Sequence, residues 1–310
     1  MLKASLDKSY HGKLLLTGEY FVLDGVPALA VPTKLGQRFT TSLTRGMGLF
    51  WMAKDLRGKQ WFKTSINWDG SLGYNHSPNA FTKRLYEILQ AADRLRPGVL
   101  QAATSHYAVH SQLEFERLWG LGTSSTLIAF MAQWLGVNPY ELLEDTFGGS
   151  GYDLACAIAD GPIRYIRNGT TPEVTPLDWR PEWLHQTYFV YRNQKQNSRE
   201  GIRAYRQAEV TSQRREEVAQ LTAALTSETP HLRAAQNLLK EHESLVGDTL
   251  GLPPVQEELF ADFPGQLKSL GAWGGDFMWA LSDRPATEVT TYFNERGLRT
   301  VIPYEELILQ

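Results

Sequence analysis

Short apolar runs that alternate with polar positions follow one another through the first third of the chain. They predict strands over residues 13–16, 28–31, 39–43, 48–53, 60–66 and 107–113. Apolar residues at helical spacing from Asn79 to Leu95, followed by Pro97 and Gly98, predict a helix that ends before the proline. Longer apolar stretches then predict helices over 124–135, 138–145 and 152–159.

The pattern loses its period between residues 168 and 180, where proline and threonine are frequent, and this predicts a domain boundary. We therefore expect one domain over residues 1–175 and a second over 176–310. The second part predicts strands over 187–191 and 299–302, helices over 199–225, 230–250, 253–270 and 286–296, and a glycine-rich turn into a strand over 272–281. Strands and helices in both halves predict a two-domain α+β fold.

Composition narrows the functional classes. The 310 residues carry 31 Lys and Arg against 34 Asp and Glu, so no global positive field favours nucleic acid or an anionic membrane as a partner. The single cysteine, Cys156, excludes an internal disulfide, a cysteine-rich zinc module and an iron–sulfur centre. No signal-peptide pattern or membrane-length apolar run is visible, so we expect a cytoplasmic protein. The sequence leaves monomer and homodimer open.

The first segment that could carry chemistry runs from Trp119 to Thr126, directly before a predicted helix. Its glycines allow close backbone approach, and the free N–H groups of a helix start attract anions such as phosphate. A plain glycine turn with a Ser or Thr helix cap explains the same residues. The Walker and Rossmann patterns are both absent.

Two further glycine-rich segments stand out. Gly148–Asp153 places one carboxylate at a helix start, where it can orient or deprotonate a hydroxyl, or simply stabilise the helix dipole. Gly271–Asp276 has three glycines in five positions, which indicates either a sharp bulge or a ligand contact. His106 and His110 have the spacing of zinc ligands on a helix, but their segment reads as a strand.

In this order, the motifs resemble those of the GHMP kinases, which include galactokinase and the homoserine, mevalonate and phosphomevalonate kinases. Gly12–Tyr20 resembles the family's opening motif, and Gly120–Ser125 resembles its Gly-Leu-Gly-Ser-Ser-Ala phosphate loop. Gly149–Ala155 resembles the Gly-Ser-Gly-Phe-Asp-Val-Ala string of the mevalonate and phosphomevalonate kinase branch. It is also similar to a bacterial subgroup with Gly-Tyr-Asp-Ile-Ala.

The resemblance implies a ribosomal-protein-S5-like N-terminal domain, a ferredoxin-like C-terminal domain, a small-molecule substrate, and ATP with Mg²⁺ as cofactors. It implies catalytic roles for Asp153 and Lys13. Mg²⁺ would be held by Ser124 and Glu144, with Glu141 as the alternative to Glu144. The implied ATP-binding residues are Gly120, Leu121, Gly122, Thr123, Ser124 and Ser125. The implied substrate-binding residues are Glu19, Tyr20, Lys195, Asn197, Ser198, Arg199, Gly274 and Gly275.

The expected activity is phosphorylation of an anionic alcohol, with mevalonate or phosphomevalonate first, because Lys195 and Arg199 suit a carboxylate or phosphate. Departures from the family pattern include Tyr20 in place of histidine, Trp273 in place of glycine and Asp276 in place of a small residue. Trp273 and Asp276 would affect how the ATP phosphates bind, by adding a bulky ring and a negative charge to this loop. The alternatives are a non-catalytic metabolite-binding protein of the same fold and an enzyme similar to diphosphomevalonate decarboxylase.

Overall fold

The computed structural model describes residues 5–45, 48–68, 79–100, 106–194, 198–227, 230–273 and 276–310. The chain forms two compact units. Unit 1 comprises Met1–Gly12, Leu35–Arg117 and Leu121–Ile158, and unit 2 comprises Lys13–Lys34, Leu118–Gly120 and Ala159–Gln310. The domain boundary near residue 175 stays a prediction.

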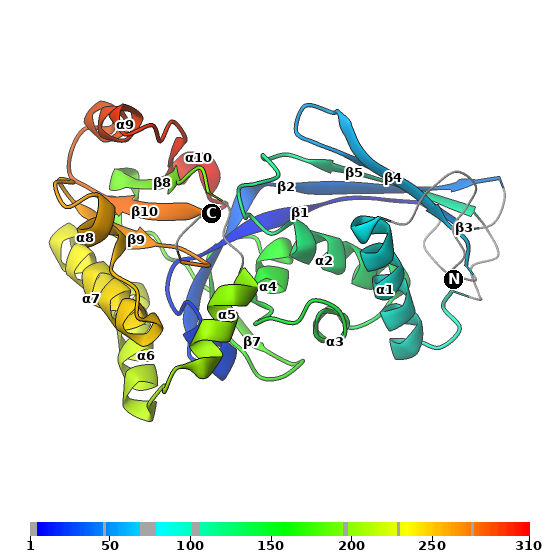
Figure 1. Cartoon of the computed structure of the whole chain (residues 1–310), viewed down its shortest axis with the longest axis horizontal. Helices are drawn as coiled ribbons and strands as arrows, with labels where there is room; N and C mark the ends of the chain where they lie inside the picture. Colours follow the sequence, from blue (N-terminus) through cyan, green and yellow to red (C-terminus); the bar gives the residue numbers. More distant parts are fainter. Residues whose placement is uncertain are drawn as a thin grey trace. The chain divides into compact units, whose positions relative to one another are not determined.

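Unit 1 packs helices against a sheet with the strand order β4-β3-β5-β2 (Figure 1). Strands β3 and β5 are parallel, and the other two pairs are antiparallel. Strand β1 pairs with β2, and both strands continue into unit 2. The elements are β1 (Leu6–Leu15), β2 (Ala28–Thr44), β3 (Gly48–Lys54), β4 (Gln60–Ile66), α1 (Ala80–Leu95), β5 (His106–Leu113), α2 (Thr123–Leu135), α3 (Pro139–Glu144) and α4 (Tyr152–Ile158).

An aromatic cluster fixes helix α2 on this sheet. Phe39 of β2 stacks on Phe130 of α2 with ring centroids 4.4 Å apart, and Tyr10 and Trp51 pack edge-on around the pair. Full burial of one such side chain contributes about 1.5–3 kcal/mol. Helix α2 also packs against α3 and α4, so the starts of these three helices are held by one core.

Unit 2 contains an antiparallel sheet with the order β11-β8-β10-β9, and its own part of β2 pairs with β6, which pairs with β7. Helix α7 packs against β9, α5 and α6. The remaining elements are η1 (Phe21–Asp24), β6 (Ile163–Ile166), β7 (Glu173–Pro176), η2 (Glu182–Gln186), β8 (Thr187–Tyr191), α5 (Ser198–Gln207), α6 (Ser212–Ser227), α7 (Leu232–Leu250), α8 (Val255–Leu259), β9 (Gln266–Ser269), β10 (Phe277–Leu281), α9 (Ala286–Glu295), β11 (Val301–Pro303) and α10 (Tyr304–Leu307).

The mixed α+β fold is confirmed, but one long helix predicted over 199–225 is wrong. The structure divides it into α5 and α6. The hydroxyl of Thr211 accepts a hydrogen bond from the backbone N–H of Arg214 at 3.1 Å, which is the bond of a helix N-cap. Thr211 therefore starts a new helix where the periodicity alone suggests continuation.

The helix predicted over 253–270 is also wrong beyond its first turns. Helix α8 ends at Leu259, and residues 266–269 form strand β9, which pairs with β10. Pro264 and Gly265 interrupt the helical pattern, and a Cβ on Gly265 would lie 2.5 Å from the carbonyl oxygen of Leu281. In the segment expected to be aperiodic, Glu173–Pro176 forms the short strand β7, whose exposed residues carry no apolar alternation.

Candidate functional site

The first glycine segment leads into α2 without a side-chain cap. Gly122 is the N-cap residue in the left-handed conformation at φ 98°, and it has no side chain to accept a hydrogen bond from the helix start. The first intrahelical bond runs from the N–H of Thr126 to the carbonyl of Gly122 at 3.1 Å. The preceding N–H groups of a helix have no intrahelical acceptor, so they can donate to an anion.

The two serines at this helix start have different environments. The hydroxyl of Ser125 is buried and donates to the carbonyl oxygen of Gly122 at 2.8 Å, so it supports the turn. Ser124 is exposed. Of the two serines, Ser124 is therefore the one that a ligand at the start of α2 could contact.

Lys13 contacts the same glycine segment within unit 2. Its half-buried ammonium Nζ donates to the carbonyl oxygen of Gly120 at 2.9 Å. The carboxylate of Asp276 lies against the same glycine, because a Cβ built on Gly120 would be 2.5 Å from its Oδ2 atom. Gly120 thus has a cation at its carbonyl and a carboxylate beside its Cα, and no larger residue fits here without movement of Asp276.

The second glycine segment uses its glycines for backbone conformation. Gly148, Gly149 and Gly151 have φ values of 66°, 114° and 85°, which disfavour residues with a side chain. A Cβ on Gly148 or Gly149 would meet nothing within 4 Å, so open space surrounds them.

Asp153 follows as the second residue of α4 and is half-buried. Burial raises the pKa of the nearby Tyr140 hydroxyl to about 12, with a smaller contribution from the negative charge of Asp153. Tyr140 therefore stays neutral at ordinary pH, and its phenol lies close enough to Asp153 to feel the charge of the carboxylate.

The carboxylates considered for Mg²⁺ lie on α3. Glu144 is the exposed last residue of this helix, and Glu141 lies half-buried in its first turn. Helix α3 packs against α2, which carries Ser124. Within the described ranges no three His, Cys, Asp or Glu side chains gather as a metal-binding group. An exposed hydroxyl and an exposed carboxylate remain a donor set suited to Mg²⁺, which keeps most of its water ligands.

The structure places Glu19 in the interior of unit 2. Its carboxylate is fully buried and forms an ion pair with Lys268 of β9, which is equally buried. Burial raises the pKa of Glu19 to about 7, although the Lys268 ammonium acts in the opposite direction. Glu19 thus pairs with Lys268, which lies in a segment that the sequence pattern predicted to be helical.

Two more buried groups complete this cluster. His242 of α7 accepts a hydrogen bond at Nε2 from the N–H of Gly18 at 2.8 Å, so its ring proton lies on Nδ1. Burial and the Lys268 charge lower the pKa of His242 well below its usual value. Glu243 accepts hydrogen bonds from the N–H groups of Val255 and Ser269. The sequence does not predict a role for Lys268 or His242, because no local motif includes either residue.

Tyr20 is 7% exposed and takes the positive φ of 64°. Its ring stacks on Tyr205 of α5 with centroids 5.9 Å apart. Both rings belong to an apolar cluster that includes Trp273, so the indole that departs from the family pattern is part of the core of unit 2.

Four predicted substrate residues, Lys195, Asn197, Gly274 and Gly275, lie outside the described residues. Ser198 and Arg199 are the first two residues of α5.

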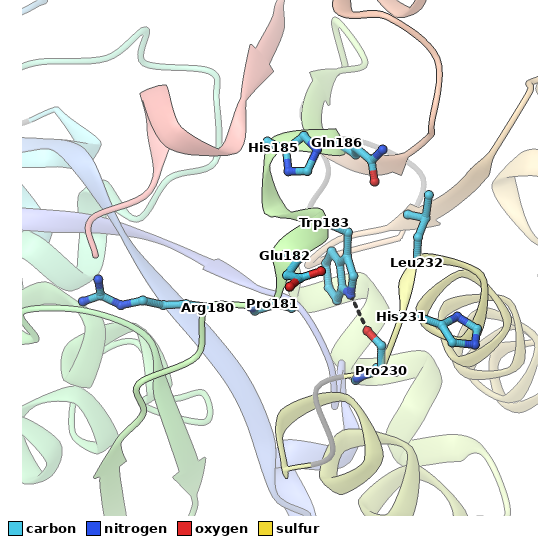
Figure 2. A pocket seen from close by; sticks show the side chains of 9 residues that line it. All are labelled: Arg180, Pro181, Glu182, Trp183, His185, Gln186, Pro230, His231 and Leu232. Carbon is cyan, nitrogen blue, oxygen red and sulfur yellow. Dashed lines mark hydrogen bonds between the residues drawn. The ribbon is translucent and has the colours of Figure 1, made fainter.

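A separate cavity of about 510 Å³ lies at the start of α7, with Trp183 and His231 among its lining residues. Figure 2 shows the indole N–H of Trp183 donating to the carbonyl of Pro230, at 2.7 Å. None of the predicted site residues lines this cavity.

Comparisons with known proteins place the fold. No family model matches the chain, and no curated protein sequence matches it either. A Lin0012 protein from Listeria innocua has a similar structure, with a TM-score of 0.72, 14% sequence identity, and coverage of 96% of this chain and 97% of that one.

Two kinases of known reaction are similar over nearly their whole length. The mevalonate kinase of Methanococcus jannaschii has a TM-score of 0.69 at 15% identity, with 99% of this chain and 98% of that one covered. The phosphomevalonate kinase of Streptococcus pneumoniae, in complex with phosphomevalonate and AMPPNP, has a TM-score of 0.68 at 18% identity, with 96% and 99% covered. The chain therefore has the GHMP kinase fold, as predicted, which it shares with these two kinases. Among the described residues, no helix is long and apolar enough to cross a bilayer.

Proposed function

We propose that this chain is an ATP-dependent kinase that phosphorylates a small anionic alcohol, with mevalonate and phosphomevalonate as the first candidates. The observation that carries the proposal is the uncapped start of α2, where Gly122 leaves backbone N–H groups available for phosphate. The fold similarity to mevalonate and phosphomevalonate kinases supports the same reaction class.

In the proposed reaction the acceptor hydroxyl attacks the γ-phosphorus of ATP and the bond to the β–γ bridging oxygen breaks. Asp153 orients the hydroxyl and accepts its proton: its carboxylate is half-buried, and side chains built at Gly148 and Gly149 just before it would meet open space. Lys13 supplies a positive charge beside Gly120. Ser124 and Glu144 would hold Mg²⁺, whose charge would offset that of the phosphates.

We infer that the acceptor is anionic from Lys195, Asn197, Ser198 and Arg199, two cations and two neutral hydrogen-bonding residues within five positions. Arginine binds a carboxylate or phosphate with two parallel hydrogen bonds, and lysine adds a point charge. Replacing Lys195 and Arg199 together with alanine should raise the KM for the acceptor and leave the KM for ATP nearly unchanged.

The Gly149–Ala155 string supports placing the chain with the bacterial subgroup that carries Gly-Tyr-Asp-Ile-Ala. A cytoplasmic location is part of the same proposal. A screen for ADP release against mevalonate, phosphomevalonate, homoserine and simple sugars tests the reaction and ranks the acceptors. Activity on galactose with none on any carboxylate or phosphorylated alcohol would contradict the anionic acceptor.

One observation favours a second candidate, a metabolite-binding protein of this fold that does not turn over ATP. The carboxylate of Asp276 lies against Gly120, and a negative charge there repels the phosphates of a nucleotide. If this candidate is correct, Asp276→Asn should bind ATP more tightly than the natural chain, and neither should release ADP with any acceptor in the screen.

A further inference from the structure

The turn formed by Gly18, Glu19 and Tyr20 is held by buried groups from two distant elements. Helix α7 contributes His242, which accepts the N–H of Gly18, and strand β9 contributes Lys268, which pairs with Glu19. Lys268 also donates to the carbonyl of Ser269, which fixes the ammonium on β9. These anchors have side-chain exposures of 1% or less, so water cannot replace them.

The turn itself has an unfavourable backbone geometry. Tyr20 has a φ of 64°, which is rare for a residue with a large side chain. A Cβ on Gly18 would lie 2.8 Å from the Cβ of Ala28, so the chain has no room to relax at that position. Residues in such conformations persist when their surroundings determine them, and here the surroundings are the Lys268 pair and the His242 bond.

Tyr20 transmits this fixed geometry to helix α5. A Cβ built on Gly201 would lie 2.1 Å from the Tyr20 hydroxyl oxygen and 2.8 Å from its ring, so the phenol contacts the helix backbone directly. One turn further along α5, Tyr205 stacks on the same ring. The hydroxyl of Tyr205 donates to Asp24 at 2.9 Å, so α5 is also tied to the end of η1.

Helix α5 begins with Ser198 and Arg199, two residues predicted to bind the acceptor. We propose that Lys268 and His242 are positioning residues for acceptor binding: they fix the Gly18–Tyr20 turn, and Tyr20 in turn fixes the start of α5 through Gly201. This inference rests on the proposed kinase function. Neither anchor needs to touch a substrate.

The test compares Lys268→Met, which removes the charge and keeps the chain length, with Lys240→Met as a matched control. Lys240 is exposed on α7 and has no part in the turn. Hydrogen exchange of the full-length protein should rise more in peptides covering residues 17–24 and 200–207 of Lys268→Met than over 286–295. The KM for the acceptor should rise about tenfold, with the KM for ATP changed less than about twofold.

Gly201→Ala provides a second variant that leaves the buried cluster intact. Its methyl group must displace the Tyr20 ring, so the same rise in acceptor KM is expected, with exchange raised over 200–207. Arg203→Ala, at an exposed position two residues further on, is its control and should behave like the natural chain.

The inference is overturned if exchange over 200–207 stays at the natural level in Lys268→Met, or if the KM values for ATP and acceptor rise equally in both variants. If the natural chain transfers no phosphoryl group at all, the proposed function fails. The exchange measurement then decides alone whether the cluster positions α5.

Discussion

Two carboxylates that follow glycines in the sequence, Asp153 in unit 1 and Glu19 in unit 2, have opposite environments. Asp153 lies half-buried at the start of α4 behind glycines with open space around them. Glu19 lies fully buried in contact with Lys268. Similar local sequences thus place one acid where it can contact a ligand and the other in the interior of its unit. The difference comes from Lys268, which is 249 positions away from Glu19 in the sequence.

The largest expected effect tests the first half of this comparison. Asp153→Asn should lower turnover by about 10²–10⁴-fold, because the amide can neither accept the proton nor carry the charge. The unfolding midpoint should stay unchanged, and Asp145→Asn, at an exposed position in the same unit, should keep full activity. Steady-state kinetics measure the turnover of each variant, and thermal unfolding measures its midpoint. Turnover within about threefold of the natural chain would assign Asp153 a structural role, since general base catalysis exceeds that factor.

The next effect concerns stability and tests the second half. At pH 8, Lys268→Met should lower the free energy of unfolding by about 3 kcal/mol. This is the lower end of the range for removing one partner of a buried ion pair, because Glu19 can become neutral by taking up a proton. Adding Glu19→Gln should recover part of this loss, because the side chain that pairs directly with Lys268 is then neutral. Denaturant unfolding of the single and double variants measures the coupling. Strictly additive losses would mean that the two side chains do not depend on each other.

A smaller effect separates the two serines of α2. Ser124→Ala should weaken binding of Mg·ATP about tenfold, or about 1.4 kcal/mol, and leave metal-free ATP nearly unaffected. Ser125→Ala should weaken both equally, because its hydroxyl supports the backbone turn at Gly122. Calorimetric titrations with and without Mg²⁺ distinguish the two. Equal losses for Ser124→Ala would identify its hydroxyl as part of the helix start alone.

The smallest effect is a pH dependence of stability. The folded-state pKa of Glu19 is raised to about 7 from 4.5, so between these pH values the folded state holds a proton that the unfolded state has lost. The contribution of Glu19 to stability therefore decreases as pH rises through that interval. His242 acts oppositely, because its lowered pKa makes stability fall as pH drops below 6.5.

Glu19→Gln isolates the first contribution, since His242 is common to both chains. The difference in unfolding free energy, natural chain minus variant, should fall from pH 5 to pH 8. A difference that grows with pH would show that Lys268 outweighs burial and lowers the pKa of Glu19.

Much of the fold follows from periodicity. The strands at 60–66 and 187–191 have the predicted bounds, and the helix ending at Leu95 begins one residue after its cap, Asn79. These elements are defined by local alternation and local caps. Strand β9 escaped prediction because its pairing with β10 decides its conformation, while its own residues are compatible with a helix.

The candidate site divides in the same way. The glycine requirement of Gly122 and Gly151 is local, and the structure gives both a positive φ. The burial of Glu19 is not local, because it depends on Lys268 and His242, which are brought to it by β9 and α7. A sequence pattern identifies which residues could do chemistry, and tertiary packing decides which of them remain available for it.

The proposed reaction is phosphoryl transfer to an anionic alcohol, with Asp153 as the base that accepts the proton of the alcohol. The most direct measurement follows transfer from ATP labelled at the γ-phosphate to mevalonate, phosphomevalonate, homoserine and galactose, with the natural chain and Asp153→Asn in parallel. We expect labelled product from mevalonate or phosphomevalonate with the natural chain and no such product with Asp153→Asn. No labelled product from any acceptor, with folded protein that binds ATP, would contradict it.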